Sequence, residues 1–218
     1  MLLAAGRGER MRPLTDCTPK PLLQVAGRAL IERQLLALRA VGVREVVVNS
    51  AHLGAQIRDY LGDGHRWGLH ISHSPEPPGA LDTGGGIRQA LPLLGTRPFL
   101  VVNSDIWTNF SFQLQPLGHD DLAHLVMVPN PPHNPDGDFG LLGDRVRPAA
   151  QPRLTYSGIA LLRPELLASS APGKFPLAPL LRAAAEDGRV SGELHCGSWI
   201  DVGTPERLTQ LRRQLGAG

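Results

Sequence analysis

The segment that most constrains this chain is residues 1–22, where an apolar start passes directly into a loop of glycines and cations. Residues 6–10 read Gly-Arg-Gly-Glu-Arg, and Lys20 lies between two prolines. Glycine lets backbone N–H groups approach an anion with no side chain in the way, and Arg10 and Lys20 bring the positive charge that a polyphosphate needs. Taken alone, such glycines also fit an ordinary surface turn. The whole segment predicts a loop around the phosphates of a nucleotide.

Two better-known phosphate loops do not match this segment. The dinucleotide-binding fingerprint requires Gly-x-Gly-x-x-Gly at the start of a helix, whereas Arg12-Pro13 follow Gly6 and Gly8 where the third glycine and the helix are needed. The Walker loop requires Gly-x4-Gly-Lys-Ser/Thr, and the sequence contains no such string. The phosphate loop must therefore be of another kind.

Strands and helices are expected to alternate through the first half of the chain. Apolar residues recur at helical spacing over residues 30–41, and Val46-Val-Val-Asn49 is an unbroken β-branched run. This rhythm predicts βαβ units and a mainly parallel sheet flanked by helices, with ligands bound beyond the carboxyl ends of the strands. Besides a strand at residues 1–5 that lacks a residue or two at its front, we expect helices at 51–61 and 83–94 and strands at 69–73 and 99–103.

The second half reads differently, with fewer helices and more turn residues. Thr204-Pro205-Glu206 is a strong helix start, with threonine as the N-cap and proline in the first position. No linker or repeat interrupts the sequence, so we expect a single domain over residues 1–218. The expected elements are strands at 122–128, 139–146, 154–162 and 193–202, and helices at 175–187 and from 204 to about 215.

Composition argues against several other classes of protein. The net charge is only +2, so no nucleic-acid partner is expected. No apolar run approaches the roughly 18 residues of a membrane span, and no signal peptide is recognisable. Cys17 and Cys196 make no zinc pattern with the histidines and are expected as reduced thiols. We expect a cytoplasmic protein without a membrane partner, either a monomer or a small homo-oligomer.

Two aspartates follow strand-like runs and are candidate metal ligands. Asp105 ends the string Asn103-Ser-Asp, and Asp201 lies in Trp199-Ile-Asp-Val-Gly-Thr-Pro. An aspartate at a strand end is commonly a turn cap, which is the alternative for each of them. Both strands, however, are expected to end near the phosphate loop. Proteins usually hold Mg²⁺ with one or two carboxylates together with phosphate oxygens and water.

The whole pattern Gly6-x-Gly-x-Arg-Met-x-Pro-Leu-Thr15, followed by Pro19-Lys-Pro-Leu22, resembles the sugar-1-phosphate nucleotidyltransferase family. This resemblance implies a Rossmann-like, GT-A-like nucleotidyltransferase fold with a mixed, mainly parallel sheet. It also implies an enzyme that transfers a nucleotidyl group from a nucleoside triphosphate to a sugar-1-phosphate, with Mg²⁺ as cofactor and pyrophosphate as product. Asp105 and Asp201 correspond to the two metal-binding acids of the family.

The resemblance also implies roles for individual residues. The catalytic set is Arg10, Lys20, Asp105 and Asp201, with Arg10 on the leaving pyrophosphate and Lys20 on the reacting phosphates. Glu76 and the glycine run after Thr83 are expected to select the nucleotide base, because backbone without side chains can approach a base closely. The alternative for these glycines is close packing of a helix. The implied nucleotide contacts are Ala4, Ala5, Gly6, Gly8, Glu9, Arg10, Lys20, Glu76, Thr83, Gly84 and Gly85.

The Thr83-Gly-Gly-Gly string is similar to the uridylyltransferase members of the family that serve bacterial cell-wall recycling, which implies UTP and a sugar-1-phosphate as small-molecule substrates. Asp82 and Ser104 depart from that pattern, which has glutamate and glycine there. The proline-rich residues 129–135 are a candidate lid over the sugar. The implied sugar contacts, each with a turn or core polar role as the alternative, are Asn103, Asp138 and Ser157.

Three other functions remain open at this point. A guanylyl-, adenylyl- or thymidylyltransferase acting on mannose- or glucose-1-phosphate would keep the chemistry and change the substrates. A non-catalytic member could bind a sugar nucleotide and regulate a partner, although the presence of Arg10, Lys20, Asp105 and Asp201 together argues against it. A generic nucleotide-binding module is the third.

Overall fold

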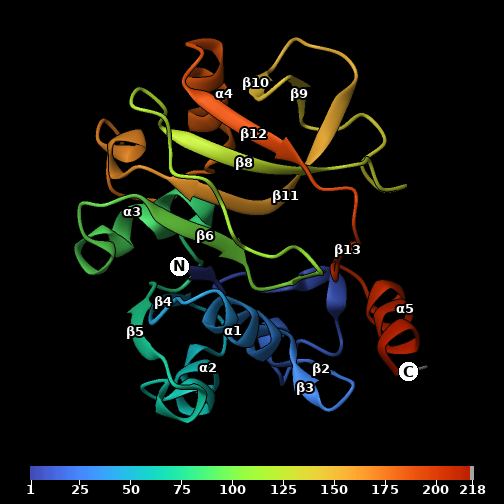
Figure 1. Ribbon diagram of the computed structural model, residues 1–218. Coiled ribbons are helices and arrows are strands. Elements are labelled where there is room, and N and C mark those ends of the chain that lie inside the picture. Colours follow the sequence, from blue (N-terminus) through green and yellow to red (C-terminus); the bar gives the residue numbers. More distant parts are fainter. Residues whose placement is uncertain (217–218) are drawn as a thin grey trace.

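The computed structural model describes residues 1–216 and is built on a nine-stranded sheet that includes strands from both halves of the chain (Figure 1). The first four strands in spatial order run parallel, and beyond them the pairings are antiparallel except for β8 with β12. The mixed α/β class is thus confirmed, but the sheet is parallel throughout only in its first part. The spatial order is β5 (His70–Pro75), β4 (Glu45–Ser50), β1 (Leu2–Leu3), β6 (Phe99–Asn103), β11 (Arg153–Leu162), β8 (Ala123–Val128), β12 (Val190–Leu194), β10 (Arg145–Arg147) and β9 (Phe139–Leu142).

Helices cover both faces of this sheet and produce two apolar cores. Val46 and Val48 of β4 pack with α1 and α2, whereas Val47 points to the opposite face with α3 and α4. Side chains alternate across a strand, so the unbroken β-branched run is explained by burial on both sides. No helix within residues 1–216 is both long and apolar enough to cross a bilayer. The helices are α1 (Leu30–Ala40), α2 (Gly54–Leu61), α3 (Asp82–Leu94), α4 (Ala178–Glu186) and α5 (Pro205–Gly216).

Most expected elements are present, with shifts at their ends that have local causes. Helix α2 begins at Gly54 rather than at residue 51, because Leu53 has a left-handed backbone (φ 52°). The strand expected over 139–146 is divided into β9 and β10, which form a hairpin around Gly143 (φ 59°). The single-domain expectation stays a prediction, although one sheet joins both halves of the chain.

The strand expected over residues 193–202 is wrong as a single element. It is two strands in two different sheets: β12 ends at Leu194, and β13 (Trp199–Asp201) pairs with β7 (Ile106–Thr108) in a separate two-stranded ribbon. The chain leaves the main sheet at Cys196-Gly197, after His195 N–H has donated to the Met127 carbonyl at 2.8 Å. Unbroken apolar character does not reveal such a change of sheet, because both pieces are extended.

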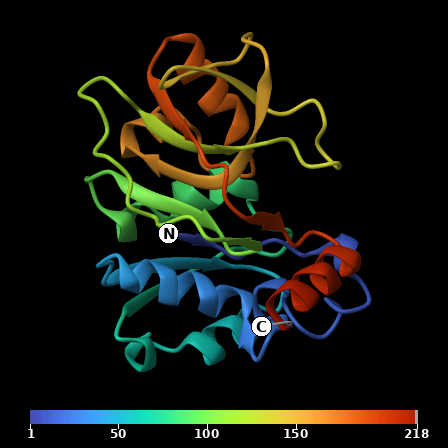
Figure 2. The same cartoon turned by 45° about the vertical axis from the view of Figure 1, so that its right-hand side comes forward.

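The C-terminal helix packs against Met11 and the segment that follows the phosphate loop, as Figures 1 and 2 show for α5 beside β2 (Gln24–Val25) and β3 (Arg28–Ala29). The predicted threonine cap is confirmed, since the Arg207 N–H donates to Thr204 Oγ1 at 3.4 Å and the Leu208 N–H to the Thr204 carbonyl at 3.0 Å. Helix α5 thereby closes a third apolar cluster over the loop. Its members include Met11, Val25 of β2 (Gln24–Val25), Leu30, Val202, Leu208 and Leu211.

Strand β11 contains an irregularity that positions a polar side chain. Its register with β8 shifts between Tyr156 and Ile159, and Gly158 there has φ +82°. A Cβ on Gly158 would lie 2.6 Å from the Asn103 amide nitrogen, so only glycine lets β11 pass this side chain. The bulge thus leaves room for Asn103 at the carboxyl end of β6.

We predict that Gly158→Ala destabilises the fold more than Gly27→Ala does. Both alanines would adopt positive φ, which costs about 1–2 kcal/mol, but nothing lies within 4 Å of a Cβ at Gly27. The clash with Asn103 should add roughly 1–3 kcal/mol at Gly158. Urea denaturation of the two variants measures the difference in unfolding free energy, and equal losses would contradict the steric account of the bulge.

Candidate active site

The loop after β1 is held open by glycine and by polar contacts to its backbone. Gly8 has φ +69°, and a Cβ there would lie 3.1 Å from the Thr15 side chain and 3.2 Å from that of Lys20. Thr15 Oγ1 donates to the Gly8 carbonyl at 2.8 Å, and the Ala4 N–H donates to Asn49 Oδ1 at 2.8 Å. The loop is therefore fixed at both ends, and residues 4–6 line a cleft.

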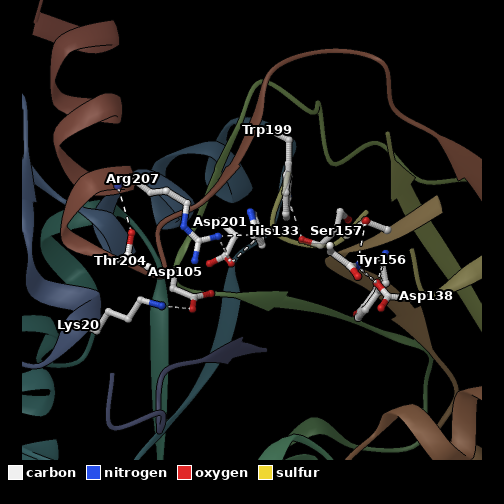
Figure 3. A network of polar contacts seen from close by, with 12 residues as sticks. Lys20, Asp105, His133, Asp138, Tyr156, Ser157, Trp199, Asp201, Thr204 and Arg207 are labelled. Atoms are coloured by element: carbon white, nitrogen blue, oxygen red, sulfur yellow. Dashed lines mark hydrogen bonds and ion pairs between the residues drawn. The ribbon is translucent and has the colours of Figure 1, made fainter. Parts of the chain in front are cut away.

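Lys20 and Asp105 both line this cleft and form an ion pair there (Figure 3). Lys20 is only 8% exposed and donates from Nζ to Asp105 Oδ2. A largely buried ammonium group needs a partner, because an unpaired buried charge is costly. The backbone just before Asp105 is fixed as well, since both the N–H and the hydroxyl of Ser104 donate to the Leu3 carbonyl, at 3.1 and 2.7 Å. The serine that departs from the family pattern is thus accommodated.

Asp201 lies beside Asp105 because β13 pairs with β7. Asp201 is paired with Ile106 in this ribbon, and the Val202 N–H donates to the Asp105 carbonyl at 2.9 Å. The predicted convergence of the two aspartates is therefore confirmed, but by a two-stranded ribbon rather than by two strands of the main sheet. In Figure 3 both carboxylates point into the same region.

Two basic side chains accompany Asp201, and neither was expected from the sequence. Arg207 Nη1 donates to Asp201 Oδ2 at 2.8 Å and lies 2.7 Å from His133 Nε2, which in turn is 3.5 Å from Asp201 Oδ2. Burial, followed by the positive charge of Arg207, lowers the pKa of His133 below its usual value of 6.5, and Asp201 opposes this shift. Arg10 belongs to the same group, because a Cβ on Gly203 would meet both Arg207 and Arg10.

The two carboxylates fit a divalent cation that is completed by substrate. Asp105 and Asp201 each use Oδ2 in the contacts above, and Oδ1 of each has no hydrogen-bond partner within the described residues. The same part of the chain has no cluster of three or more histidine, cysteine or acidic side chains that could hold a metal. Mg²⁺ is commonly bound by one or two carboxylates with phosphate oxygens and water, so the donor set suits that ion.

The cleft beside the loop has a volume of about 190 Å³. It includes several of the nucleotide contacts expected from the sequence, whereas Gly8 and Arg10 are not part of its wall. The residues in its wall include Ala4, Ala5, Gly6, Lys20, Asn49, Asp82, Thr83, Asn103 and Asp105.

A second cleft of about 230 Å³ adjoins the first, and Leu3, Thr83 and Asn103 line both. Two of the expected sugar contacts, Asn103 and Asp138, lie in its wall. The third, Ser157, does not: it is 1% exposed, and its Oγ accepts from the Ile159 N–H at 3.2 Å. The structure therefore favours the core polar role for this serine.

Asp138 is fixed by its neighbours rather than free to move. Its Oδ2 accepts from the Tyr156 N–H at 2.8 Å and from Asn134 Nδ2 at 3.3 Å. Asn134 belongs to the proline-rich loop and also donates to Thr155 Oγ1 at 3.1 Å. The loop is thus attached to β11 at its base, and its motion as a lid stays a prediction. Burial raises the pKa of the Tyr156 hydroxyl, which remains protonated as a donor at the edge of this cleft.

The residues expected to recognise the nucleotide base are in contact with other parts of the protein. Glu76 accepts from Asn49 Nδ2 at 2.6 Å and from the Leu81 N–H at 2.7 Å, so both its oxygens hold the loop that precedes α3. A Cβ on Gly84 would lie 2.4 Å from the Phe175 ring, and one on Gly85 would lie 2.1 Å from the Gly173 carbonyl. The close-packing alternative thus explains these glycines, and their contact with a base stays a prediction.

The sequence did not point to four residues that the structure brings into the site. Asn49 was expected only as part of a strand. An amide side chain near the end of a buried strand can, however, indicate a binding site at that edge of the sheet. Arg207 and His133 lie on a helix and a loop whose approach to Asp201 depends on tertiary structure. The Trp199 indole donates to the Ser157 carbonyl at 2.9 Å and joins the ribbon to β11.

The site can now be set beside known proteins. The family model described as "Nucleotidyl transferase" matches residues 1–144. The N-acetylmuramate alpha-1-phosphate uridylyltransferase of Neisseria meningitidis is 53% identical over 100% of this chain and 98% of its own length. That of Caulobacter vibrioides is 38% identical over 99% and 96%. A solved putative glucose-1-phosphate thymidylyltransferase from Bacillus anthracis superposes with a TM-score of 0.82 at 18% identity, covering 98% of this chain and 93% of that one, which supports the fold.

We predict that Arg207→Ala raises the pKa of His133 in the metal-free protein. The substitution removes a neighbouring positive charge and opens the site to water, and these are the two largest causes of the depressed value, whereas the attraction of Asp201 remains. Histidine-ring NMR titration measures this, with the His133 signal identified by its loss in His133→Asn. An unchanged or lower pKa in Arg207→Ala would contradict the described arrangement.

Proposed function

This chain belongs to the nucleotidyl transferase family, and from that premise we propose that it transfers a uridylyl group from UTP to N-acetylmuramate α-1-phosphate, giving UDP-N-acetylmuramate and pyrophosphate. The observation that best supports the reaction type is the juxtaposition of Lys20, Asp105 and Asp201 beside the phosphate loop. The choice of base and sugar rests on the two relatives that match the chain over nearly its full length. Peptidoglycan recycling is the process that such an activity would serve.

The proposed step is a single in-line displacement at phosphorus. An oxygen of the sugar-1-phosphate attacks the α-phosphorus of UTP, a new P–O bond forms, and the bond to the bridging oxygen breaks as pyrophosphate leaves. A phosphate oxygen is already nucleophilic at neutral pH, so the reaction needs no general base. Catalysis then consists of positioning the two phosphates and neutralising the charge that collects on them.

The chain's own residues supply much of this positioning. The backbone of Ala4, Ala5 and Gly6 would hold the triphosphate, with Lys20 at the reacting phosphates. Arg10 and Arg207 lie together near Asp201 and bring positive charge to the open side of the site. We propose Arg10 for the leaving pyrophosphate and Arg207 for holding the Asp201 carboxylate in place.

The family generally works with a divalent metal ion, and we propose Mg²⁺ held by Asp105 and Asp201. Bound there, the ion would neutralise the phosphates of the two substrates. Lys20 and Arg207 hold one oxygen of each carboxylate, which leaves the other available. We also propose that the uracil base contacts the segment from Glu76 to Gly85. We further propose a cytoplasmic location and a monomeric or small homo-oligomeric state.

The substrate assignment is tested by measuring pyrophosphate release with Mg²⁺ and N-acetylmuramate-1-phosphate against UTP, dTTP, GTP, ATP and CTP in turn. We expect release with UTP at a rate at least about tenfold above the others. If pyrophosphate is released only with glucose- or mannose-1-phosphate as the sugar substrate, the proposed reaction type stands and the proposed sugar is wrong. Binding without release for every pair would favour a regulatory sugar-nucleotide-binding protein.

The mechanism is tested by Asp105→Asn, with Asp59→Asn on the exposed face of α2 as a matched control. Asparagine keeps the shape of the side chain but removes the charge that pairs with Lys20 and would attract the metal. We expect kcat to fall at least about a hundredfold in Asp105→Asn, with secondary structure retained by circular dichroism, and to stay unchanged in the control. Near-normal turnover in Asp105→Asn would remove this aspartate from the mechanism.

A further inference from the structure

One cation in the second cleft has no role in the chemistry described above. Arg182 of α4 lies in the wall of this cleft with Asp138 and Tyr156. Within residues 1–216, no other arginine or lysine lines the cleft. No ion pair joins its guanidinium to an acidic group anywhere in residues 1–216, and none of the hydrogen bonds found there involves its side chain. An arginine in this state can bind a carboxylate through two parallel N–H donors.

Arg182 is exposed, but its guanidinium lies over an aromatic ring of the cleft wall. Glu186 lies one turn further along α4, at the spacing that commonly forms an ion pair on an exposed helix, yet the two do not pair. Instead the Arg182 guanidinium carbon lies 5.3 Å from the centroid of the Phe139 ring, within the range of a cation–π contact. Phe139 is buried and also lines the cleft, so this contact keeps the cation at the cleft wall.

The beginning of α4 adds positive potential at the same place. Leu177 and Ala178 line the cleft, so the helix presents its N-terminal end there. The Leu177 N–H is bound to Thr83 Oγ1 at 2.9 Å, which attaches the start of α4 to α3. A helix N-terminus favours a nearby anion. The cleft wall at α4 is therefore suited to a negatively charged group.

The position of this wall relative to the phosphate cleft indicates which part of a substrate reaches it. Asn103 and Thr83 line both clefts, so a sugar whose 1-phosphate lies toward Asp105 would extend past Asn103 into the second cleft. Asp138 and the Tyr156 hydroxyl offer one acceptor and one donor for sugar hydroxyl or amide groups. A substituent on the ring would then meet Arg182 and the start of α4.

We propose that Arg182 is a specificity-determining residue that binds the carboxylate of the lactyl ether on the sugar and so separates N-acetylmuramate-1-phosphate from neutral amino-sugar phosphates. The inference rests on the proposed function, because it takes the sugar from that assignment. N-acetylmuramate differs from N-acetylglucosamine by this lactyl group. The lactyl carboxylate is therefore the negative charge that N-acetylmuramate-1-phosphate carries in addition to its phosphate. Arg182 binds that charge and takes no part in breaking or forming bonds.

The test compares Arg182→Gln with Arg88→Gln, which removes the same charge from α3 at a separate cavity. Each protein is assayed for pyrophosphate release with UTP and either N-acetylmuramate-1-phosphate or its lactyl methyl ester, which lacks the negative charge of the lactyl carboxylate. We expect Arg182→Gln to raise the KM for the acid at least about tenfold, with kcat and the KM for UTP nearly unchanged. The KM for the ester should be the same in Arg182→Gln, Arg88→Gln and the unmodified protein, and Arg182→Lys should recover part of the loss for the acid.

The other outcomes are distinct from one another. If the KM for the acid is unchanged in Arg182→Gln, the inference is overturned and the proposed function stands. If Arg182→Gln raises the KM for the acid and for the ester equally, Arg182 only shapes the cleft, and the inference is again overturned. If the unmodified protein releases no pyrophosphate with N-acetylmuramate-1-phosphate, the proposed function fails and this inference fails with it.

Discussion

The pairing of β13 with β7 is the interaction on which the rest of this site depends. Asp105 follows a strand of the main sheet, but Asp201 comes from a segment that has left that sheet, and only the ribbon brings the two carboxylates together. The Val202 N–H bond to the Asp105 carbonyl fixes their backbones to each other. Helix α5 begins directly afterwards and packs its apolar face on Met11 of the phosphate loop. One short antiparallel contact thus joins the two proposed metal ligands, the C-terminal helix and the loop.

Both carboxylates of the site are paired with cations. Each proposed metal ligand is paired with a cation, Asp105 with Lys20 and Asp201 with Arg207, and these pairs lie at partly buried positions where an isolated charge would be costly. Binding of a polyphosphate and a divalent cation would provide both signs of charge at once. In the proposed complex, Lys20 and Arg207 would keep one oxygen of each carboxylate in place, and the other oxygen would be available to the metal. The arrangement suits a reaction that is promoted by positioning and neutralisation rather than by proton transfer.

Local pattern predicted the elements, and tertiary pairing decided how they meet. The helical spacing over 30–41, the β-branched run at Val46 and the cap at Thr204 each correspond to an observed element, because each depends on neighbours in sequence. The break between β12 and β13 was not predicted, since extended residues look alike whichever sheet they join. For the same reason Arg207 and Arg182 were not expected in the site. Their roles depend on where α5 and α4 pack, and a charged residue on an amphipathic helix gives no sign of that.

The most direct test of the account is a titration with Mn²⁺, a paramagnetic substitute for Mg²⁺, followed by electron paramagnetic resonance in the presence of UTP. If both carboxylates hold the ion, Asp201→Asn should raise the Kd for Mn²⁺ at least about tenfold, as should Asp105→Asn. A Leu194→Ser variant, altered at an exposed residue just before the chain leaves the main sheet, serves as the control and should bind like the unmodified protein. Unchanged Mn²⁺ affinity in Asp201→Asn would contradict the claim that the β7–β13 ribbon builds the metal site.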